Sequence, residues 1–245
     1  MCAHPACMSP WLNWHHFDPP FREEKHHRPK GLIGLCADHA QAADGEAYSV
    51  EQLREWKSRG RGEKDVQGFF EWLHAGLAIV MGRCIFPGAT VALALRGQPA
   101  IWLERSLSGP LVLNVRMPTV TGEPRLGVYH NWFLAADTPE GMILRCPPIG
   151  HRRIEVEYEV GDRFAIEFTR MSGLPAVKIE LAVPAAGIEI DSSAIRVGGF
   201  SQSAVFVSAP VGLALGGSPP PYAAVRTAEE ELPENLTLAL WPFEQ

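Results

Sequence analysis

The chain has 245 residues, 46% of them hydrophobic, and carries 22 Lys and Arg against 28 Asp and Glu, a formal net charge of −6. This length and apolar content suit two domains with buried cores, and the negative charge argues against a general binder of polyanions. No apolar run is long enough to cross a bilayer, and no signal peptide precedes the first cysteine. Together with metal-type cysteine spacing, this predicts a reducing, cytoplasmic location.

Cysteine and histidine gather in the first forty residues, which hold three of the five cysteines and six of the nine histidines. Cys2 and Cys7 form one short-spaced pair, and Cys36 and His39 form a second. Two such pairs suit tetrahedral zinc, because each pair presents two thiol or imidazole donors to one ion. The alternative is a set of buried cysteines and surface histidines that bind nothing.

The residues around these pairs follow a definite order. Residues 13–19 read NWHHFDP, residues 31–39 read GLIGLCADH, and a predicted helix over residues 48–57 ends in LREWK. Ser49 and Gln52 form a predicted capping box at the start of that helix. With the cysteine pairs, this order resembles the HNH endonuclease family over about residues 1–60. The resemblance implies a ββα-metal core, in which a β-hairpin carries the first histidines and a following helix carries the last metal ligand.

The resemblance also implies a role for each candidate residue. A structural zinc would be held by Cys2, Cys7, Cys36 and His39. His15 would bind one catalytic divalent ion, which neutralises charge on the scissile phosphate. His16 would act as the general base and take a proton from the attacking water.

Two positions depart from the family pattern. Gly31 stands where the motif has the asparagine that braces the hairpin, and Ala40 stands where it has a final histidine. Asp44 follows Ala40 by one helical turn, so it would share the same helix face and could supply an oxygen ligand for Mg²⁺ or Mn²⁺. The alternative for Asp44 is an ordinary polar residue before a turn.

The chain after residue 62 divides into three predicted parts that follow the HNH-like zinc-binding module of residues 1–62. Residues 63–75 form a linker with a short helix or an aromatic plug at Phe69–Leu73. Residues 76–215 form an all-β domain, and residues 216–245 form a Pro/Gly-rich and acidic C-terminal segment. The expected fold class is therefore mostly β, with a small α+β module in front.

The all-β domain is predicted from short alternating strands at near-regular spacing, which is typical of a sandwich or a solenoid. The expected strands lie at residues 77–81, 90–95, 100–103, 111–116, 125–129, 142–145, 153–158, 163–168, 176–181, 188–190 and 204–207. Cys84 and Cys146 are expected to be buried free thiols, and Asn131-Trp132 is expected to be a turn with a core tryptophan. This region has no Gly-rich phosphate loop, nucleophile elbow or paired-carboxylate cluster.

Three functions remain open at this point. The first is a divalent-metal-dependent endonuclease that acts on DNA or another nucleic acid. The second is a non-catalytic zinc-binding module that contacts DNA or protein, and the third is a structural or assembly component dominated by the β domain. Residues 1–64 hold nine cationic and nine acidic residues, whereas the remainder carries the whole net charge of −6. We therefore expect nucleic acid to contact the first module, and a protein partner or a second copy to contact the β domain.

Overall fold

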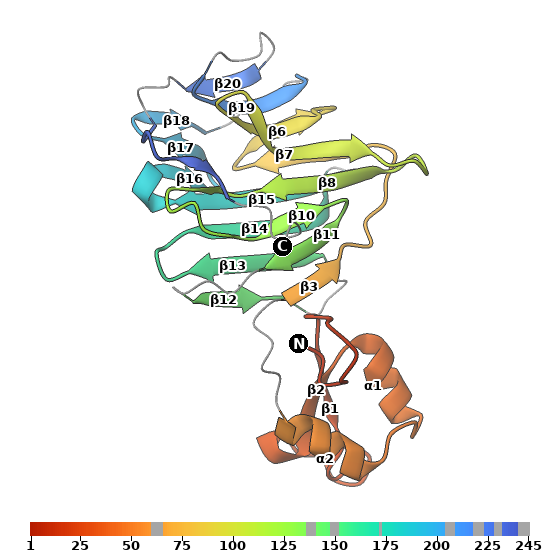
Figure 1. Ribbon diagram of the computed structural model, residues 1–245. Helices are drawn as coiled ribbons and strands as arrows, with labels where there is room; N and C mark the ends of the chain where they lie inside the picture. Colours follow the sequence, from red (N-terminus) through yellow and green to blue (C-terminus); the bar gives the residue numbers. More distant parts are fainter. Residues whose placement is uncertain are drawn as a thin grey trace. The chain divides into compact units, whose positions relative to one another are not determined.

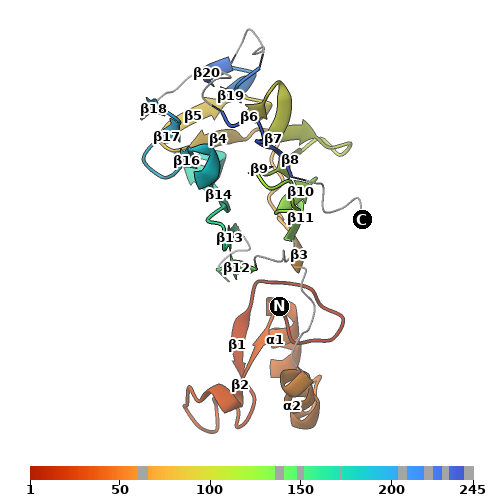
Figure 2. The same cartoon turned by 60° about the vertical axis from the view of Figure 1, so that its left-hand side comes forward.

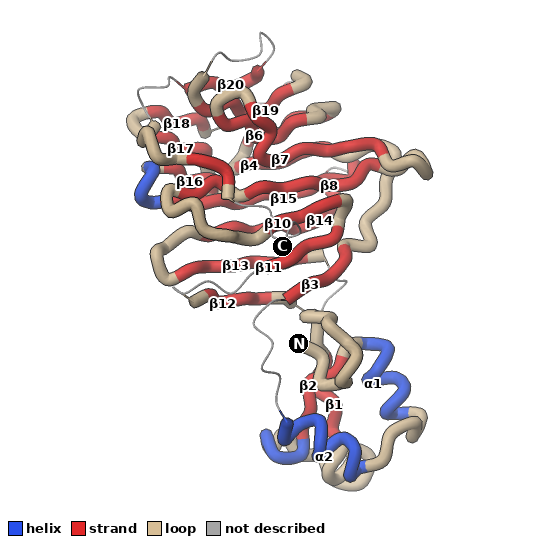
Figure 3. Tube along the Cα trace, in the orientation of Figure 1, coloured by secondary structure: helices blue, strands red, loops and turns tan. Residues whose placement is uncertain are grey.

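The computed structural model describes residues 1–59, 66–135, 141–147, 152–171, 173–203, 209–217, 223–227 and 232–239. The chain forms two compact units, Met1–Gly68 with Cys146–His151, and Phe69–Arg145 with Arg152–Gln245. In the described part, both α-helices belong to the first unit, and the second unit is built mainly from strands, with one short 3-10 helix at Pro184–Ala186 (Figure 3). None of the described helices has the length and apolar character needed to span a membrane.

The first unit consists of a β-hairpin followed by two helices (Figure 1). Its elements in chain order are β1 (Asn13–His16), a 3-10 turn (Pro29–Gly31), β2 (Leu32–Leu35), α1 (Ala37–Asp44) and α2 (Val50–Arg59). β1 and β2 pair antiparallel, with His15 opposite Ile33 and His16 opposite Leu32.

Helix α2 begins at the predicted capping box. The Ser49 backbone N–H donates to Gln52 Oε1 at 2.8 Å, and the Gln52 backbone N–H donates to Ser49 Oγ at 3.2 Å. The reciprocal pair satisfies two backbone donors that the first helical turn leaves free. The prediction of the capping box is confirmed.

One hydrophobic cluster of the first unit draws on the hairpin, both helices and the N-terminal loop. Its buried residues are Cys2, Phe17, Ile33, Leu35, Cys36, Ala43 and Leu53. Modules of this length commonly rely on a metal or another cross-link in addition to such a cluster. Two of the buried residues, Cys2 and Cys36, are themselves predicted zinc ligands.

Two β-sheets make up the second unit. The first has the order β20 (Ala223–Thr227), β19 (Val211–Leu215), β6 (Val91–Leu95), β7 (Gln98–Arg105), β8 (Leu111–Arg116), β10 (Gly127–Tyr129), β11 (Trp132–Ala135), β3 (Val66–Phe69). The second has the order β12 (Met142–Arg145), β13 (Arg153–Tyr158), β14 (Arg163–Met171), β15 (Leu174–Val183), β16 (Ile188–Ile190), β17 (Ile195–Val197), β18 (Phe200–Gln202). β4 (Ala78–Met81) lies parallel to β15 and pairs with β5 (Cys84–Pro87), and β9 (Pro118–Thr119) pairs with β21 (Thr237–Leu238).

The two sheets face each other as the layers of a sandwich (Figure 2). Side chains from both sheets meet between the layers. The ring of Phe70 lies 5.2 Å from that of Phe133 on β11 and 5.1 Å from that of Phe168 on β14, measured between centroids. These contacts belong to a core that joins the sheets, so the sandwich is the correct one of the two predicted β architectures.

The predicted strands between residues 77 and 190 are present, with shifted ends in several cases. The expected strand at residues 204–207 lies outside the described residues. The predicted short helix at Phe69–Leu73 is wrong, because β3 ends at Phe69 and no helix follows it there; the buried Phe70 matches the alternative, an aromatic plug. Residues 216–245 are not a separate segment either, since they contribute β20 and β21 to the β structure.

The interpretation of Asn131-Trp132 is half correct. His130 and Asn131 form a turn with positive φ angles of 49° and 68°. Asn131 is fully buried: its Oδ1 accepts from the Leu113 backbone N–H at 2.7 Å, and its Nδ2 donates to the Phe70 carbonyl at 3.2 Å. Trp132 is 52% exposed, so the expectation of a core tryptophan is wrong, and the asparagine is the residue that holds this corner of the sandwich.

The two remaining cysteines form no disulfide within the described residues. Cys84 is buried in β5, as predicted, whereas the expected burial of Cys146 is wrong, because this residue follows β12 and is only partly buried. Burial raises the pKa of Cys146 to about 12, so this thiol is protonated at neutral pH.

The buried Asn131 generates a stability prediction. Asn131→Ala removes hydrogen bonds to two buried backbone groups and places a Cβ-bearing residue without local hydrogen bonding at φ 68°. We expect the free energy of unfolding to fall by about 2–4 kcal/mol in urea denaturation. Trp132→Ala is the matched control at the neighbouring position, with an expected loss of about 1 kcal/mol or less. Equal losses in the two variants would contradict a structural role for the asparagine.

Candidate metal centre and histidine cavity

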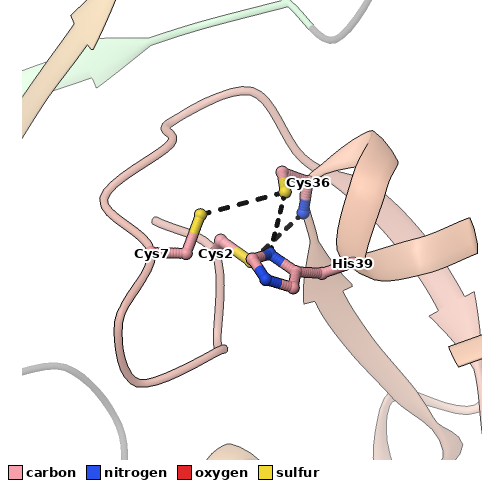
Figure 4. Close-up of side chains that lie close together, drawn as sticks. All are labelled: Cys2, Cys7, Cys36 and His39. Atoms are coloured by element: carbon pink, nitrogen blue, oxygen red, sulfur yellow. Dashed lines mark hydrogen bonds between the residues drawn. The ribbon is translucent and has the colours of Figure 1, made fainter. Parts of the chain in front are cut away.

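Four predicted metal ligands meet in the first unit. The sulfur and imidazole nitrogen atoms that lie within 4.8 Å of one another belong to Cys2, Cys7, Cys36 and His39 (Figure 4). Cys7 Sγ lies 3.8 Å from Cys36 Sγ. His39 Nδ1 lies 3.6 Å from Cys2 Sγ and 3.1 Å from Cys36 Sγ.

These separations fit a tetrahedral ion. With Zn–S bonds of about 2.3 Å and Zn–N bonds of about 2.05 Å, two sulfurs stand about 3.8 Å apart and a sulfur and a nitrogen about 3.6 Å apart. The Cys7–Cys36 and Cys2–His39 distances have these values, and the Cys36–His39 distance is shorter. The cluster can therefore hold a metal such as zinc.

Local structure explains why the four side chains converge. Cys36 directly follows β2 and is the N-cap of α1, so His39 in the first turn of α1 lies on the same side. The Cys36 backbone N–H donates to Cys2 Sγ at 3.2 Å, and the ring of His4 stacks on that of His39 with centroids 4.0 Å apart. These contacts orient the ligands from outside, as partners of metal ligands commonly do.

The protonation of the metal-free ligands is set mainly by burial. Burial raises the pKa of the Cys2, Cys7 and Cys36 thiols above the ordinary value. Burial, followed by the neighbouring His4, lowers the pKa of His39. At neutral pH the histidine is therefore neutral and ready to bind, whereas the thiols must lose protons to a metal.

A cavity of about 1160 Å³ adjoins β1, the loop after it and both helices. His15, His16, Ala40 and Asp44 all line it. His15 Nδ1 lies 3.4 Å from Asp44 Oδ1; the side chain of His15 is 11% exposed and that of Asp44 is 75% exposed. Ala40 and Asp44 share one face of α1, as predicted, and that face meets the strand that carries the two histidines.

The His15–Asp44 contact joins a neutral imidazole to a carboxylate. Burial lowers the pKa of His15 more strongly than the Asp44 charge raises it, so the ring is uncharged at neutral pH. A neutral imidazole nitrogen and an exposed carboxylate oxygen are both available to a divalent cation. Ala40 offers no ligand atom, and within the described residues only the cysteine cluster brings three or more possible ligands together.

His16 Nε2 is buried and has no hydrogen-bond partner among the described residues. Its ring is surrounded by the rings of Phe21, His26 and His27, at centroid distances of 4.8, 5.3 and 5.4 Å. Leaving a buried nitrogen unsatisfied costs free energy, and at this cavity wall a water molecule or a bound ligand can supply the partner. The predicted general base is thus placed in the cavity with its nitrogen uncommitted.

The departure at Gly31 has a steric reason. A Cβ at this position would lie 2.4 Å from His26 Cε1 and 2.5 Å from the Asp18 carbonyl oxygen. The buried His26 fills the space: its Nε2 lies 3.0 Å from the Pro19 carbonyl oxygen, and its Nδ1 accepts from the Arg28 backbone N–H at 3.2 Å. Because a carbonyl only accepts, Nε2 carries the proton, and the imidazole bridges the two ends of the loop.

His26 is the residue that sequence reasoning missed. It sits in a charged loop beside His27, where the pattern indicates a solvated surface. The one signal in the sequence is Gly31 at the position of the motif's asparagine. A glycine there indicates that another group comes close to the hairpin backbone.

The final motif of the first unit, at residues 53–57, holds α2 against the hairpin and its loop. Leu53 is buried, and Arg54 forms a bidentate pair with Asp18 at 2.8 and 2.9 Å. Lys57 Nζ donates to the backbone carbonyls of the turn before β2, those of Pro29, Lys30 and Leu32. These residues are structural, and they position the loop that follows His16.

Comparison with models of known protein families, with curated proteins and with solved structures gives no match.

The metal cluster generates a compositional prediction. Purified protein should contain about one tightly held zinc per chain, because three thiolates and one imidazole close the coordination sphere. Cys36→Ser should lose the zinc and unfold the first unit while the β-sandwich stays folded, as measured by elemental analysis and amide hydrogen exchange. Cys146→Ser, at a cysteine outside the cluster, is the control and should keep its zinc. Wild-type protein that contains no zinc when prepared without chelator would contradict zinc binding by the four residues.

The raised thiol pKa values predict how zinc affinity depends on pH. Each thiol that must lose its proton lowers the apparent affinity about tenfold per pH unit below its pKa. Competition with a chelator at pH 8, 7 and 6 should therefore show zinc held most tightly at pH 8 and released progressively as the pH falls. An affinity that does not change over this range would show that the ligands are not the three thiols.

Proposed function

We propose that this chain is a divalent-metal-dependent endonuclease of the HNH type, which hydrolyses phosphodiester bonds of nucleic acid. The observation that carries the proposal is one arrangement in the cavity. The neutral His15 lies 3.4 Å from Asp44, and the neighbouring His16 has a buried Nε2 without a partner. A two-ligand cation site beside an uncommitted imidazole is suited to metal-assisted hydrolysis.

The order of elements supports this assignment. The hairpin β1–β2 carries both histidines, and α1 follows directly and carries His39 and Asp44. The cysteine cluster joins the N-terminal loop, the end of β2 and the start of α1. This arrangement resembles the ββα-metal core implied by the sequence, in which the structural zinc and the catalytic cation occupy separate sites.

Each residue in the cavity then has a defined task. His15 and Asp44 would hold Mg²⁺ or Mn²⁺, which supplies charge neutralisation at the scissile phosphate. His16 Nε2 accepts the proton of the attacking water, and the surrounding rings of Phe21 and His27 restrict the position of the imidazole. His26 holds the loop that carries these rings, through its hydrogen bonds at both loop ends.

A second function is favoured by Ala40. Because alanine contributes no ligand, the candidate cation site has two protein ligands, where catalytic metal sites usually have more. The corresponding alternative is a zinc-binding module that contacts DNA or protein without cleaving it. The endonuclease requires a divalent cation beside His15 and a proton-accepting His16, whereas the binding module requires neither.

The endonuclease proposal predicts the effect of His16→Ala. Plasmid DNA should be nicked in the presence of Mg²⁺ or Mn²⁺, and the variant should nick it about 10²–10⁴-fold more slowly, the usual contribution of a positioned base. Its zinc content and fold should not change, because His16 contacts none of the four cluster ligands. The surface variant His130→Ala, in the β-sandwich, should nick at the wild-type rate. Wild-type activity in His16→Ala would contradict the assigned role.

Helix α1 offers a test of the cation site itself. Asp44→Ala should raise the concentration of Mn²⁺ needed for half-maximal cleavage at least about tenfold, because it removes one of two protein ligands. Ala40→His should lower that concentration, because the new side chain lines the same cavity on the same helix face. If neither substitution changes the Mn²⁺ concentration needed for cleavage, the active cation binds elsewhere. If only Ala40→His cleaves DNA, the natural chain is the non-catalytic binding module.

A further inference from the structure

Two exposed aromatic side chains stand beside the histidines of the cavity. Trp14 precedes His15 on β1 and is 70% exposed, and Phe21 is 42% exposed with its ring 4.8 Å from that of His16. Both line the same cavity as His15 and His16. Exposed aromatic rings beside a polar site offer flat apolar faces against which a planar group can pack.

Trp14 also borders a second hollow. An adjoining groove of about 800 Å³ is lined mainly by apolar residues, among them Leu12, Leu32 and Trp56. Trp14 is among the lining residues of both the groove and the histidine cavity. Lys57 is the only cationic residue among the described residues that line the groove, and its ammonium group already donates to three backbone carbonyls. The groove therefore suits an apolar planar group better than a phosphate.

The charges around the cavity are largely neutralised by the protein itself. Arg22 pairs with Glu46 at 3.0 Å, and Arg54 pairs with Asp18 at 2.8 Å. Residues 1–64 carry equal numbers of cationic and acidic residues. Duplex DNA is held mainly by cations that neutralise its phosphates, and this module has no surplus of them. Single strands offer a second source of affinity, because their unpaired bases stack on aromatic side chains.

We propose, building on the proposed endonuclease function, that the substrate is single-stranded nucleic acid and that Trp14 and Phe21 are its specificity-determining residues. The scissile phosphate enters the cavity at His16. The base on one side stacks on Phe21, and the base on the other side stacks on Trp14 and enters the apolar groove. A paired base cannot leave its stack to occupy the groove without breaking its base pair, which costs free energy and disfavours duplex substrates.

The first test measures binding by the full chain without Mg²⁺ or Mn²⁺, so that it does not depend on cleavage. The probes are a short oligothymidylate, an oligouridylate of the same length and a duplex of the same length. Both single strands should quench tryptophan fluorescence and bind at least about tenfold more tightly than the duplex. Trp14→Leu and Phe21→Leu should each weaken single-strand binding about tenfold, within the range expected for one stacked base. A preference for the DNA or the RNA strand identifies which nucleic acid is the substrate.

Trp132→Leu is the matched control, since this tryptophan is exposed to a similar degree in the β-sandwich. It should bind all three probes as the wild type does. The inference is overturned if the duplex binds as tightly as the single strands, or if Trp14→Leu and Phe21→Leu bind like the control. Single-strand binding without cleavage on addition of Mn²⁺ would uphold single-strand recognition by Trp14 and Phe21 and refute the endonuclease, whereas equal cleavage of duplex and single strand would uphold the endonuclease and overturn the single-strand preference.

Discussion

The first unit depends on the convergence of three cysteines and one histidine. Two of the seven buried side chains in its hydrophobic cluster, Cys2 and Cys36, are also members of the possible metal site, so the packing and the ligands share residues. Cys36 and His39 lie at the junction between β2 and α1, and Cys2 and Cys7 bring the N-terminal loop to the same point. The position of Asp44 beside His15 follows from this junction, because the two residues lie on the helix and the hairpin that it connects.

Polar contacts fix the backbone of the loops in the first unit. His26 bridges the ends of the loop after β1, Arg54 holds Asp18 at the start of that loop, and Lys57 binds the carbonyls of the turn before β2. Each contact fixes backbone next to the histidine cavity. Together these contacts hold the backbone of the loop that surrounds His16.

Sequence was informative where local chemistry decides the structure. The spacing of the cysteine pairs, the capping box at Ser49 and the alternation of the central strands all depend on near neighbours, and the structure has each of them. Prediction failed where partners are distant in sequence. The sequence around Phe70 is compatible with a short helix or an aromatic plug, and only the contact with Phe168, about a hundred residues away, decides for the plug. His26 and Asn131 are polar residues in loops, and only the tertiary fold shows that they are buried.

The proposed endonuclease requires a catalytic cation between His15 and Asp44, apart from the cysteine cluster. A crystal structure of the full chain grown with Mn²⁺, with anomalous scattering collected at the manganese and zinc edges, tests this claim most directly. We predict zinc at the four cluster ligands and manganese within bonding distance of His15 and Asp44, with His16 Nε2 facing a solvent molecule near that ion. Zinc at the cluster, with no manganese beside His15 at saturating Mn²⁺, would contradict the claim and leave a binding module.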